Sequence, residues 1–126
     1  MRIQMRLSKE ARVVLEELKL NYLKTGIAKT SGEVIDEIFL TFKDRLNDIN
    51  WNAVLAQPEF DGVLADYTSV NPTTLNLSQD TINTMESFRI FLNEKLQMKR
   101  TVYRSFIIRI TLKAFELEKN GFNISL

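Results

Sequence analysis

The chain starts with a strict alternation of polar and apolar residues. The apolar positions are Ile3, Met5 and Leu7, and the polar positions between them are Arg2, Gln4 and Arg6. A period of two is typical of a strand with one buried face. We therefore predict a short strand over residues 2–8 with a polar outward face.

A helical period follows the alternation. Ser8 is a favoured N-cap residue, and apolar residues then recur at helical spacing, at Ala11, Val14, Leu15, Leu18 and Tyr22. This pattern predicts an amphipathic helix. It is expected to end near Gly26, because glycine readily takes the left-handed C′ conformation and Ile27 can then fold back onto the last turn.

A second helix is predicted from Thr30 onward. Thr30 and Glu33 have the spacing of a capping box, in which each residue satisfies a backbone N–H of the other. A broad apolar stripe follows, formed by Val34, Ile35, Ile38, Phe39, Phe42 and Leu46. A broad stripe indicates a deeply buried helix. Residues 1–46 therefore form one unit of strand, helix and helix.

The same order of elements returns at an offset of 70, which places Leu7 and Ser8 on Leu77 and Ser78. In residues 73–78 the apolar or small face is Thr73, Leu75 and Leu77, and the polar face is Thr74 and Asn76. The last helix matches less closely, with apolar residues at Val102, Phe106, Ile107, Ile110, Ala114 and Leu117. An insertion is expected at residues 97–100. The second unit spans residues 72–120, and residues 121–126 are a C-terminal tail.

An acidic segment, residues 47–71, separates the two units. It contains Pro58 and Gly62 and is followed directly by Pro72, which is typical of a linker. A short helix is expected at residues 51–56. The apolar residues of the segment suggest that it packs on the body, with Trp51 and Tyr67 as anchors.

Composition excludes several classes of protein. The 126 residues include no Cys and no His, which removes disulfides, thiolate metal sites and the commonest general base. The carboxylates of Asp36, Glu37, Asp44 and Asp48 are expected on a solvated helix face. An enzyme is therefore disfavoured, and no cofactor is expected. No apolar run could span a bilayer and no signal core is evident, so a cytoplasmic location is expected.

Charge is distributed unevenly along the chain despite a net charge of only +1. Residues 1–30 contain 7 Lys/Arg against 3 Asp/Glu, residues 31–71 contain 2 against 8, and residues 72–126 contain 8 against 5. This asymmetry suits a protein that turns one face toward phosphate, although a solvated mixed surface is the alternative.

The two predicted strands need each other. A lone strand cannot satisfy its own backbone hydrogen bonds, so antiparallel pairing of residues 2–8 with residues 73–78 is expected. The predicted fold is mainly α with a two-stranded antiparallel β-ribbon. Such a ribbon is narrow enough for the major groove, where Arg bonds guanine and Gln or Asn bonds adenine. The side chains on its polar face are Arg2, Gln4, Arg6, Thr74 and Asn76.

The chain resembles the ribbon-helix-helix DNA-binding superfamily, which includes the β-ribbon proteins Arc and MetJ. The resemblance lies in Arg2-Ile3-Gln4-Met5-Arg6-Leu7-Ser8, Thr30-Ser31-Gly32-Glu33-Val34-Ile35 and Thr74-Leu75-Asn76-Leu77-Ser78. It implies a tandem pseudo-dimer whose outward strand residues contact bases. It also implies that the N-termini of the second helices bind backbone phosphates. The phosphate contacts would be Lys29, Thr30, Ser31, Lys99, Arg100, Thr101 and Arg104.

Fusion of two units in one chain is similar to the TraY-like accessory proteins of plasmid conjugation. The implied functions are transcriptional regulation, for example as a repressor, or a relaxosome accessory role at a transfer origin. The implied partners are double-stranded DNA, further copies of the chain on adjacent sites, and a relaxase or other DNA-processing protein. No membrane partner is expected.

Two structural alternatives and one functional alternative stay open on the sequence. The N-terminal polar residues could be a frayed, solvated end, and Thr30, Ser31 and Thr101 could be plain helix caps. A helical adaptor or antitoxin-type interaction module is the second functional class. Only residues 120–126 follow the last predicted helix, whereas antitoxins of this fold usually have a longer toxin-binding tail.

Overall fold

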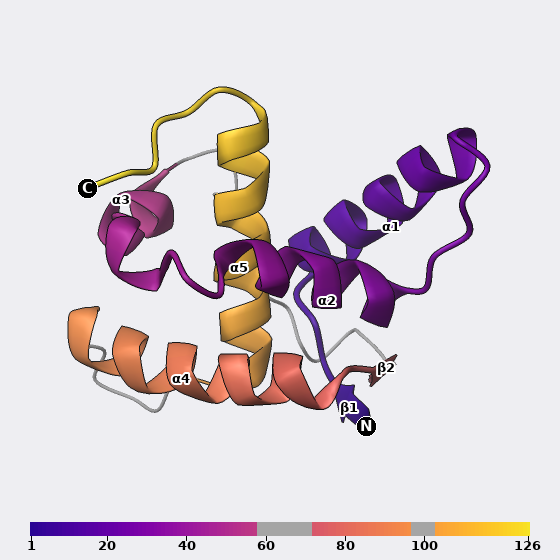
Figure 1. Ribbon diagram of the computed structural model, residues 1–126, viewed down its shortest axis with the longest axis horizontal. Coiled ribbons are helices and arrows are strands. Elements are labelled where there is room, and N and C mark those ends of the chain that lie inside the picture. The colour runs from indigo at the N-terminus through magenta and orange to yellow at the C-terminus, as the bar shows by residue number, and fades with distance from the viewer. Residues whose placement is uncertain (58–71, 97–102) are drawn as a thin grey trace.

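The computed structural model describes residues 1–57, 72–96 and 103–126, and its ribbon is drawn in Figure 1. These residues form a mainly helical structure with one two-stranded sheet. In chain order the elements are β1 (Arg2–Met5), α1 (Lys9–Lys24), α2 (Ser31–Phe42), the 3-10 helix η1 (Leu46–Asp48), α3 (Trp51–Ala56), β2 (Thr73–Asn76), α4 (Gln79–Lys95) and α5 (Arg104–Lys119).

The sheet confirms the predicted strand pairing. β1 and β2 are antiparallel, with Arg2 opposite Asn76 and Ile3 opposite Leu75. The apolar face points inward: Leu75 is buried, and Ile3 packs against the core while remaining partly exposed. The strands are shorter than the predicted ranges, because the ladder ends at Met5 and Asn76 and the chain then turns into the helices.

Side-chain caps set the starts of three helices where the sequence predicted them. The Ser8 hydroxyl accepts from the Ala11 N–H at 3.2 Å, and the Ser78 hydroxyl accepts from the Thr81 N–H at 3.1 Å. Thr30 and Glu33 form the full capping box at α2. Each cap satisfies a backbone donor that the first turn of a helix leaves unpaired.

The end of α1 also follows the prediction at the level of the backbone. Gly26 has a φ of 85°, and the Ile27 N–H donates to the Tyr22 carbonyl at 3.0 Å. A bond of this kind closes the last turn of a helix through a left-handed residue. The Ile27 side chain nevertheless stays 46% exposed, so it contributes little packing to the turn.

α2 and α5 lie at the centre of the helical body and contact each other, while α1 and α4 each contact both of them (Figure 1). Aromatic rings fill the space where α2, α3 and α4 meet. The ring centroids of Phe39 and Phe88 are 5.4 Å apart, and those of Trp51 and Phe88 are 5.9 Å apart. The buried core therefore draws on both halves of the sequence.

The predicted extent of the second helix was wrong at its C-terminal end. The apolar stripe suggested a helix that continues to Leu46, but α2 ends at Phe42 and Leu46 begins η1. The Leu46 carbonyl accepts a hydrogen bond from the Trp51 indole N–H at 2.9 Å. This contact holds the chain in a turn, so Leu46 packs against the core from η1 and not from α2.

The expected short helix is present as α3, with Trp51 and Val54 buried. The first part of the acidic segment therefore packs on the body, as the sequence suggested. The second predicted anchor, Tyr67, lies outside the described residues, as does the rest of the segment from residue 58 to residue 71.

The C-terminal residues are tied back to the middle of the chain. Asn50 donates its N–H to the Ile124 carbonyl at 2.8 Å, and Leu126 donates to the Asp48 carbonyl at 3.0 Å. Ile124 is buried. Residues 121–126, which the sequence predicted to be a tail, therefore pack against the body. Within the described ranges, none of the helices has the length and apolar character that crossing a membrane requires.

Candidate nucleic-acid interface

The outward face of the ribbon consists of polar side chains from both strands. Arg2, Gln4, Thr74 and Asn76 are exposed, and the exposed Arg6 follows β1 directly. Gln4 lies opposite Thr74 in the ladder, and its side-chain amide donates to the Thr74 hydroxyl at 3.3 Å. The structure therefore brings together side chains that lie about seventy positions apart in the sequence.

The N-terminus of α2 lies beside this face. A shallow groove of about 620 Å³ runs between them, lined by Arg2, Lys19, Lys29, Thr30, Ser31, Gly32, Glu33, Thr74 and Asn76. The groove therefore joins three of the five side chains predicted to contact bases with all three residues of the first unit predicted to contact phosphate. Gln4 and Arg6 are not among its lining residues.

Gly32 allows α2 to come so close to the ribbon. A Cβ atom built on Gly32 would lie 2.2 Å from the backbone carbonyl oxygen of Asn76. That distance is far inside van der Waals contact, so any other residue would push α2 and β2 apart. The position of the groove therefore depends on the missing side chain.

The capping box leaves part of the α2 N-terminus available. The Thr30 hydroxyl accepts from the Glu33 N–H at 3.2 Å, and the Glu33 carboxylate accepts from the Thr30 N–H at 3.1 Å. In the first turn the Ser31 N–H has no acceptor within the helix, whereas Gly32 is buried against β2. Free first-turn amides and the positive end of the helix dipole form a general anion site.

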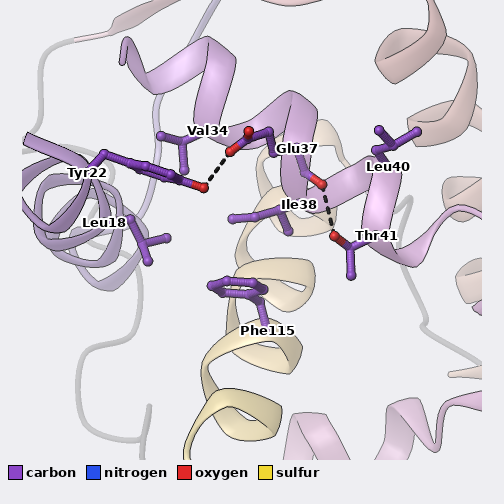
Figure 2. Close-up of a pocket in the computed structure, with 8 residues that line it drawn as sticks. All are labelled: Leu18, Tyr22, Val34, Glu37, Ile38, Leu40, Thr41 and Phe115. Atoms are coloured by element: carbon purple, nitrogen blue, oxygen red, sulfur yellow. Dashed lines mark hydrogen bonds between the residues drawn. The ribbon is translucent and has the colours of Figure 1, made fainter. Parts of the chain in front are cut away.

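Lys29 precedes this N-terminus but already has an anionic partner. Its ammonium group donates a hydrogen bond to one oxygen of Glu37 and lies 4.7 Å from the centre of the Tyr22 ring. The Tyr22 hydroxyl donates to the other carboxylate oxygen at 2.5 Å, as Figure 2 shows. The pKa of Glu37 lies below its ordinary value, first because Lys29 donates to it and then because Tyr22 does. The same contacts raise the pKa of Lys29 and that of Tyr22.

The second unit has a different helix start. Tyr103 is the N-cap residue of α5, and among the described residues no side chain caps that helix. Arg104 is exposed in its first turn. The other predicted phosphate contacts of this unit, Lys99, Arg100 and Thr101, lie outside the described residues.

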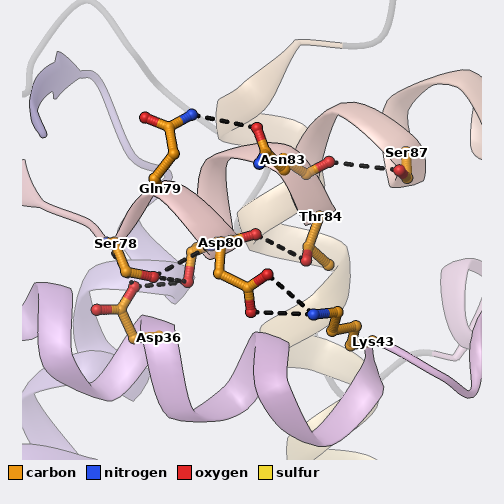
Figure 3. Close-up of polar contacts among 9 residues, drawn as sticks. Asp36, Lys43, Ser78, Gln79, Asp80, Asn83, Thr84 and Ser87 are labelled. Atoms are coloured by element: carbon orange, nitrogen blue, oxygen red, sulfur yellow. Dashed lines mark hydrogen bonds and ion pairs between the residues drawn. The ribbon is translucent and has the colours of Figure 1, made fainter.

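Polar contacts attach the start of α4 to α2 (Figure 3). The Asp36 carboxylate accepts from the Ser78 N–H at 3.1 Å and from the Thr81 hydroxyl at 2.6 Å. Lys43 forms an ion pair with Asp80, with a shortest N–O distance of 2.9 Å. Because β2 leads directly into α4, these contacts also fix the position of β2 relative to α2.

Sequence reasoning missed these contacts. Asp36 and Glu37 were expected on a solvated face, yet both bind side chains or amides from other elements. Helical periodicity locates a carboxylate outside the apolar stripe, but it gives no information on a partner that is distant in sequence. The sequence did place Ser78 and Lys29 at or next to predicted helix starts, but it gave no indication of their carboxylate partners.

No group of side chains suited to hold a metal ion occurs among the residues that the structure describes. Comparison of the chain with protein-family models, with curated proteins and with solved structures finds no match.

Proposed function

We propose that this chain is a sequence-specific double-stranded DNA-binding protein of the ribbon-helix-helix type, folded as a tandem pseudo-dimer. Its β-ribbon enters the major groove, and the N-termini of α2 and α5 hold the phosphates on either side. The units that make up the pseudo-dimer are β1, α1 and α2 in the first half, and β2, α4 and α5 in the second.

One observation carries the proposal. A polar ribbon face and the N-terminus of α2 line a single groove, in which base-reading and anion-binding groups lie side by side. If the outer face of the ribbon were merely solvated, the N-terminus of α2 would not need to pack through Gly32 against the Asn76 carbonyl. The arrangement matches the two tasks of a DNA-binding protein, which are to hold the backbone and to read base edges.

The side chains of the ribbon suit base recognition. Arginine can donate two hydrogen bonds to guanine, and glutamine or asparagine can make a paired contact with adenine. Arg2 faces Asn76 across the ladder, and Gln4 faces Thr74. In the described part of the chain Arg2 has no carboxylate partner, so its guanidinium is available for a base.

Two biological settings use this chemistry. One is transcriptional regulation at an operator, and the other is assembly of a nucleoprotein complex at a plasmid transfer origin, beside a relaxase. Further copies on adjacent sites are compatible with both. The contacts with DNA are the same in each case, so the genes that lie beside the binding site decide between them.

The first experiment is selection of bound fragments from a random duplex library, followed by fluorescence anisotropy on the recovered site. Binding is expected in the nanomolar range, with an affinity that falls steeply as salt is added, because cations on the protein displace counterions from phosphate. A helical adaptor that binds only protein partners would give neither result. Failure to enrich any sequence, together with binding that does not respond to salt, overturns the proposal.

Variants of one residue type then test the ribbon. Replacing Asn76 by Ala should cost about 1–3 kcal/mol of binding free energy at the selected site and relax the base preference there. Asn52→Ala is the matched control, because Asn52 is an exposed asparagine on α3, at the opposite side of the molecule from the ribbon in Figure 1. Equal losses from the two variants would contradict base reading by the ribbon.

A further inference from the structure

The Lys29–Glu37–Tyr22 cluster lies where the proposed DNA contact begins. Lys29 lines the groove beside the ribbon, whereas Glu37 lines a second, apolar pocket between α1, α2 and α5. Figure 2 shows Glu37 directed toward Tyr22 and away from Leu40. The Lys29 ammonium group is held by the Glu37 carboxylate and lies over the Tyr22 ring.

This cluster is held from two sides. The two oxygens of Glu37 accept from Lys29 and from Tyr22, and the Lys29 side chain is only 18% exposed. A lysine side chain held in this way has given up most of its rotamer freedom before any ligand arrives. Its charge is also balanced locally by the carboxylate, which reduces its attraction for a phosphate at a distance.

Glu37 and a DNA phosphate would compete for the same ammonium group. Lys29 lies one residue before Thr30, the N-cap of α2, and therefore next to the first-turn amides of that helix. A phosphate bound by those amides would be within reach of a flexible lysine side chain, provided that Lys29 leaves Glu37. The negative charges of Glu37 and of a phosphate attract the same ammonium group, so the two contacts compete for Lys29.

We infer that Glu37 restrains the phosphate contact of the DNA site: it competes with phosphate for Lys29 and thereby lowers the affinity of the chain for every duplex alike. This inference rests on the proposed function. Phosphate contacts contribute affinity without sequence information, so a carboxylate that competes with one of them reduces binding to random DNA. The ribbon contacts then decide where the protein stays.

The test is a double-mutant cycle on the full chain, with anisotropy on the selected site and on a random duplex. Glu37→Gln keeps the shape of the side chain and removes its charge. Because an exposed ion pair contributes little, we expect Glu37→Gln to tighten binding to both duplexes by the same factor, about two- to five-fold. In a Lys29→Met background, the same Glu37→Gln change should have no effect.

Glu17→Gln is the matched control for charge. Glu17 is also an exposed glutamate, but it lies on α1 near Glu116 of α5. Its replacement should leave both affinities unchanged. A gain from Glu37→Gln that persists without Lys29, or an equal gain from Glu17→Gln, would show a general charge effect and overturn the inference.

The Lys29→Met variant alone gives an independent result. If Lys29 moves to a phosphate in the complex, its loss should reduce the slope of log affinity against log salt by about 0.9. An unchanged slope means that Lys29 stays with Glu37, which contradicts the inference but leaves DNA binding intact. Absence of duplex binding by the wild-type chain would instead overturn the proposed function itself, and the inference with it.

Discussion

Gly32 shows how one missing side chain positions two elements. Its Cα faces the Asn76 carbonyl so closely that a methyl group would overlap with it. Elsewhere in a helix a glycine is a weakness, because it loses more backbone entropy on folding than alanine does. Here that entropic cost is offset by the contact between α2 and the ribbon.

The sign of the effect of Gly32→Ala on stability is therefore a sharp test. At an ordinary helical position this change would stabilise the protein by up to about 1 kcal/mol. At Gly32 we expect a loss of about 1–3 kcal/mol in the free energy of unfolding, because the inserted atom must force α2 away from β2. Urea denaturation followed by circular dichroism measures it. A more stable variant would show that the helix and the strand are not in contact.

The sequence predicted local features such as helix caps well, but it predicted contacts between distant residues poorly. Ser8, Ser78 and Thr30 were identified as caps because a cap and its partner are three residues apart. The alternation in residues 2–8 and 73–78 gave the outward face of the ribbon before its partner was known. The Asp36 contact with Ser78 joins residues 42 positions apart, and no local pattern indicates such a pair.

Among the elements, α3 depends on a side chain from α5. Lys113 is buried, and its ammonium group donates to the Gln57 carbonyl at 2.7 Å and to the Leu55 carbonyl at 3.1 Å. Carbonyl groups at a helix C-terminus have no intrahelical donor, and a cation there also opposes the negative end of the helix dipole. Periodicity placed Lys113 between Ile110 and Ala114 of the apolar stripe but gave no reason to expect a buried lysine.

Lys113→Met should consequently loosen α3. The thioether fills a similar volume but cannot donate, so two carbonyl groups lose their partner at a cost of about 1–3 kcal/mol. Hydrogen exchange should quicken most at the amides of residues 51–57. Lys119→Met, an exposed change in the same helix, is the control. Identical exchange in the two variants would mean that Lys113 does not support α3.

An ion pair also joins the segment after α2 to the end of α5. Arg45, after α2, donates to Glu118 near the end of α5, and this bond lowers the pKa of Glu118. Because the folded pKa is below the unfolded value near 4.5, the pair stabilises the fold above that pH, and its contribution is lost as the pH falls through the folded pKa. The side chains are 34% and 39% exposed, so the contribution is small.

Glu118→Gln should thus lower the free energy of unfolding at pH 7 by less than about 1 kcal/mol. Below its lowered folded pKa the wild-type carboxyl is protonated and neutral like the amide, so the two proteins should there unfold at the same urea concentration. A pH series of urea titrations checks the convergence. A difference that stays constant from pH 7 down through the folded pKa would mean that the effect does not come from the charge of Glu118.

At the scale of the whole molecule, the two halves of the ribbon are unlike. β1 contributes Arg2 and Gln4 to the outward face, whereas β2 contributes Thr74 and Asn76. The helix starts also differ, since α2 has a capping box and α5 begins after Tyr103 with no side-chain cap among the described residues. The two strands of the ribbon and the two helix starts thus present different chemistry.

On the proposed function, the preferred DNA site should therefore lack two-fold symmetry, unlike the palindromes that mirror symmetric dimers. The selected sequences give the site directly. Converting either half of it into the inverted repeat of the other should weaken binding, because one half-site would then face the wrong strand. If a perfect palindrome binds as tightly as the selected site, the asymmetry of the ribbon has no role in recognition.

The sheet has a further consequence for synthesis of the chain. Each of its two strands is only four residues long, and they come from positions 2–5 and 73–76. Contacts between such distant positions are slow to form, and none can exist before the ribosome has released the second strand. An incomplete chain that stops short of residue 73 exposes the first strand without its partner. Formation of the ribbon, and of any function that depends on its outward face, therefore waits for translation past residue 76.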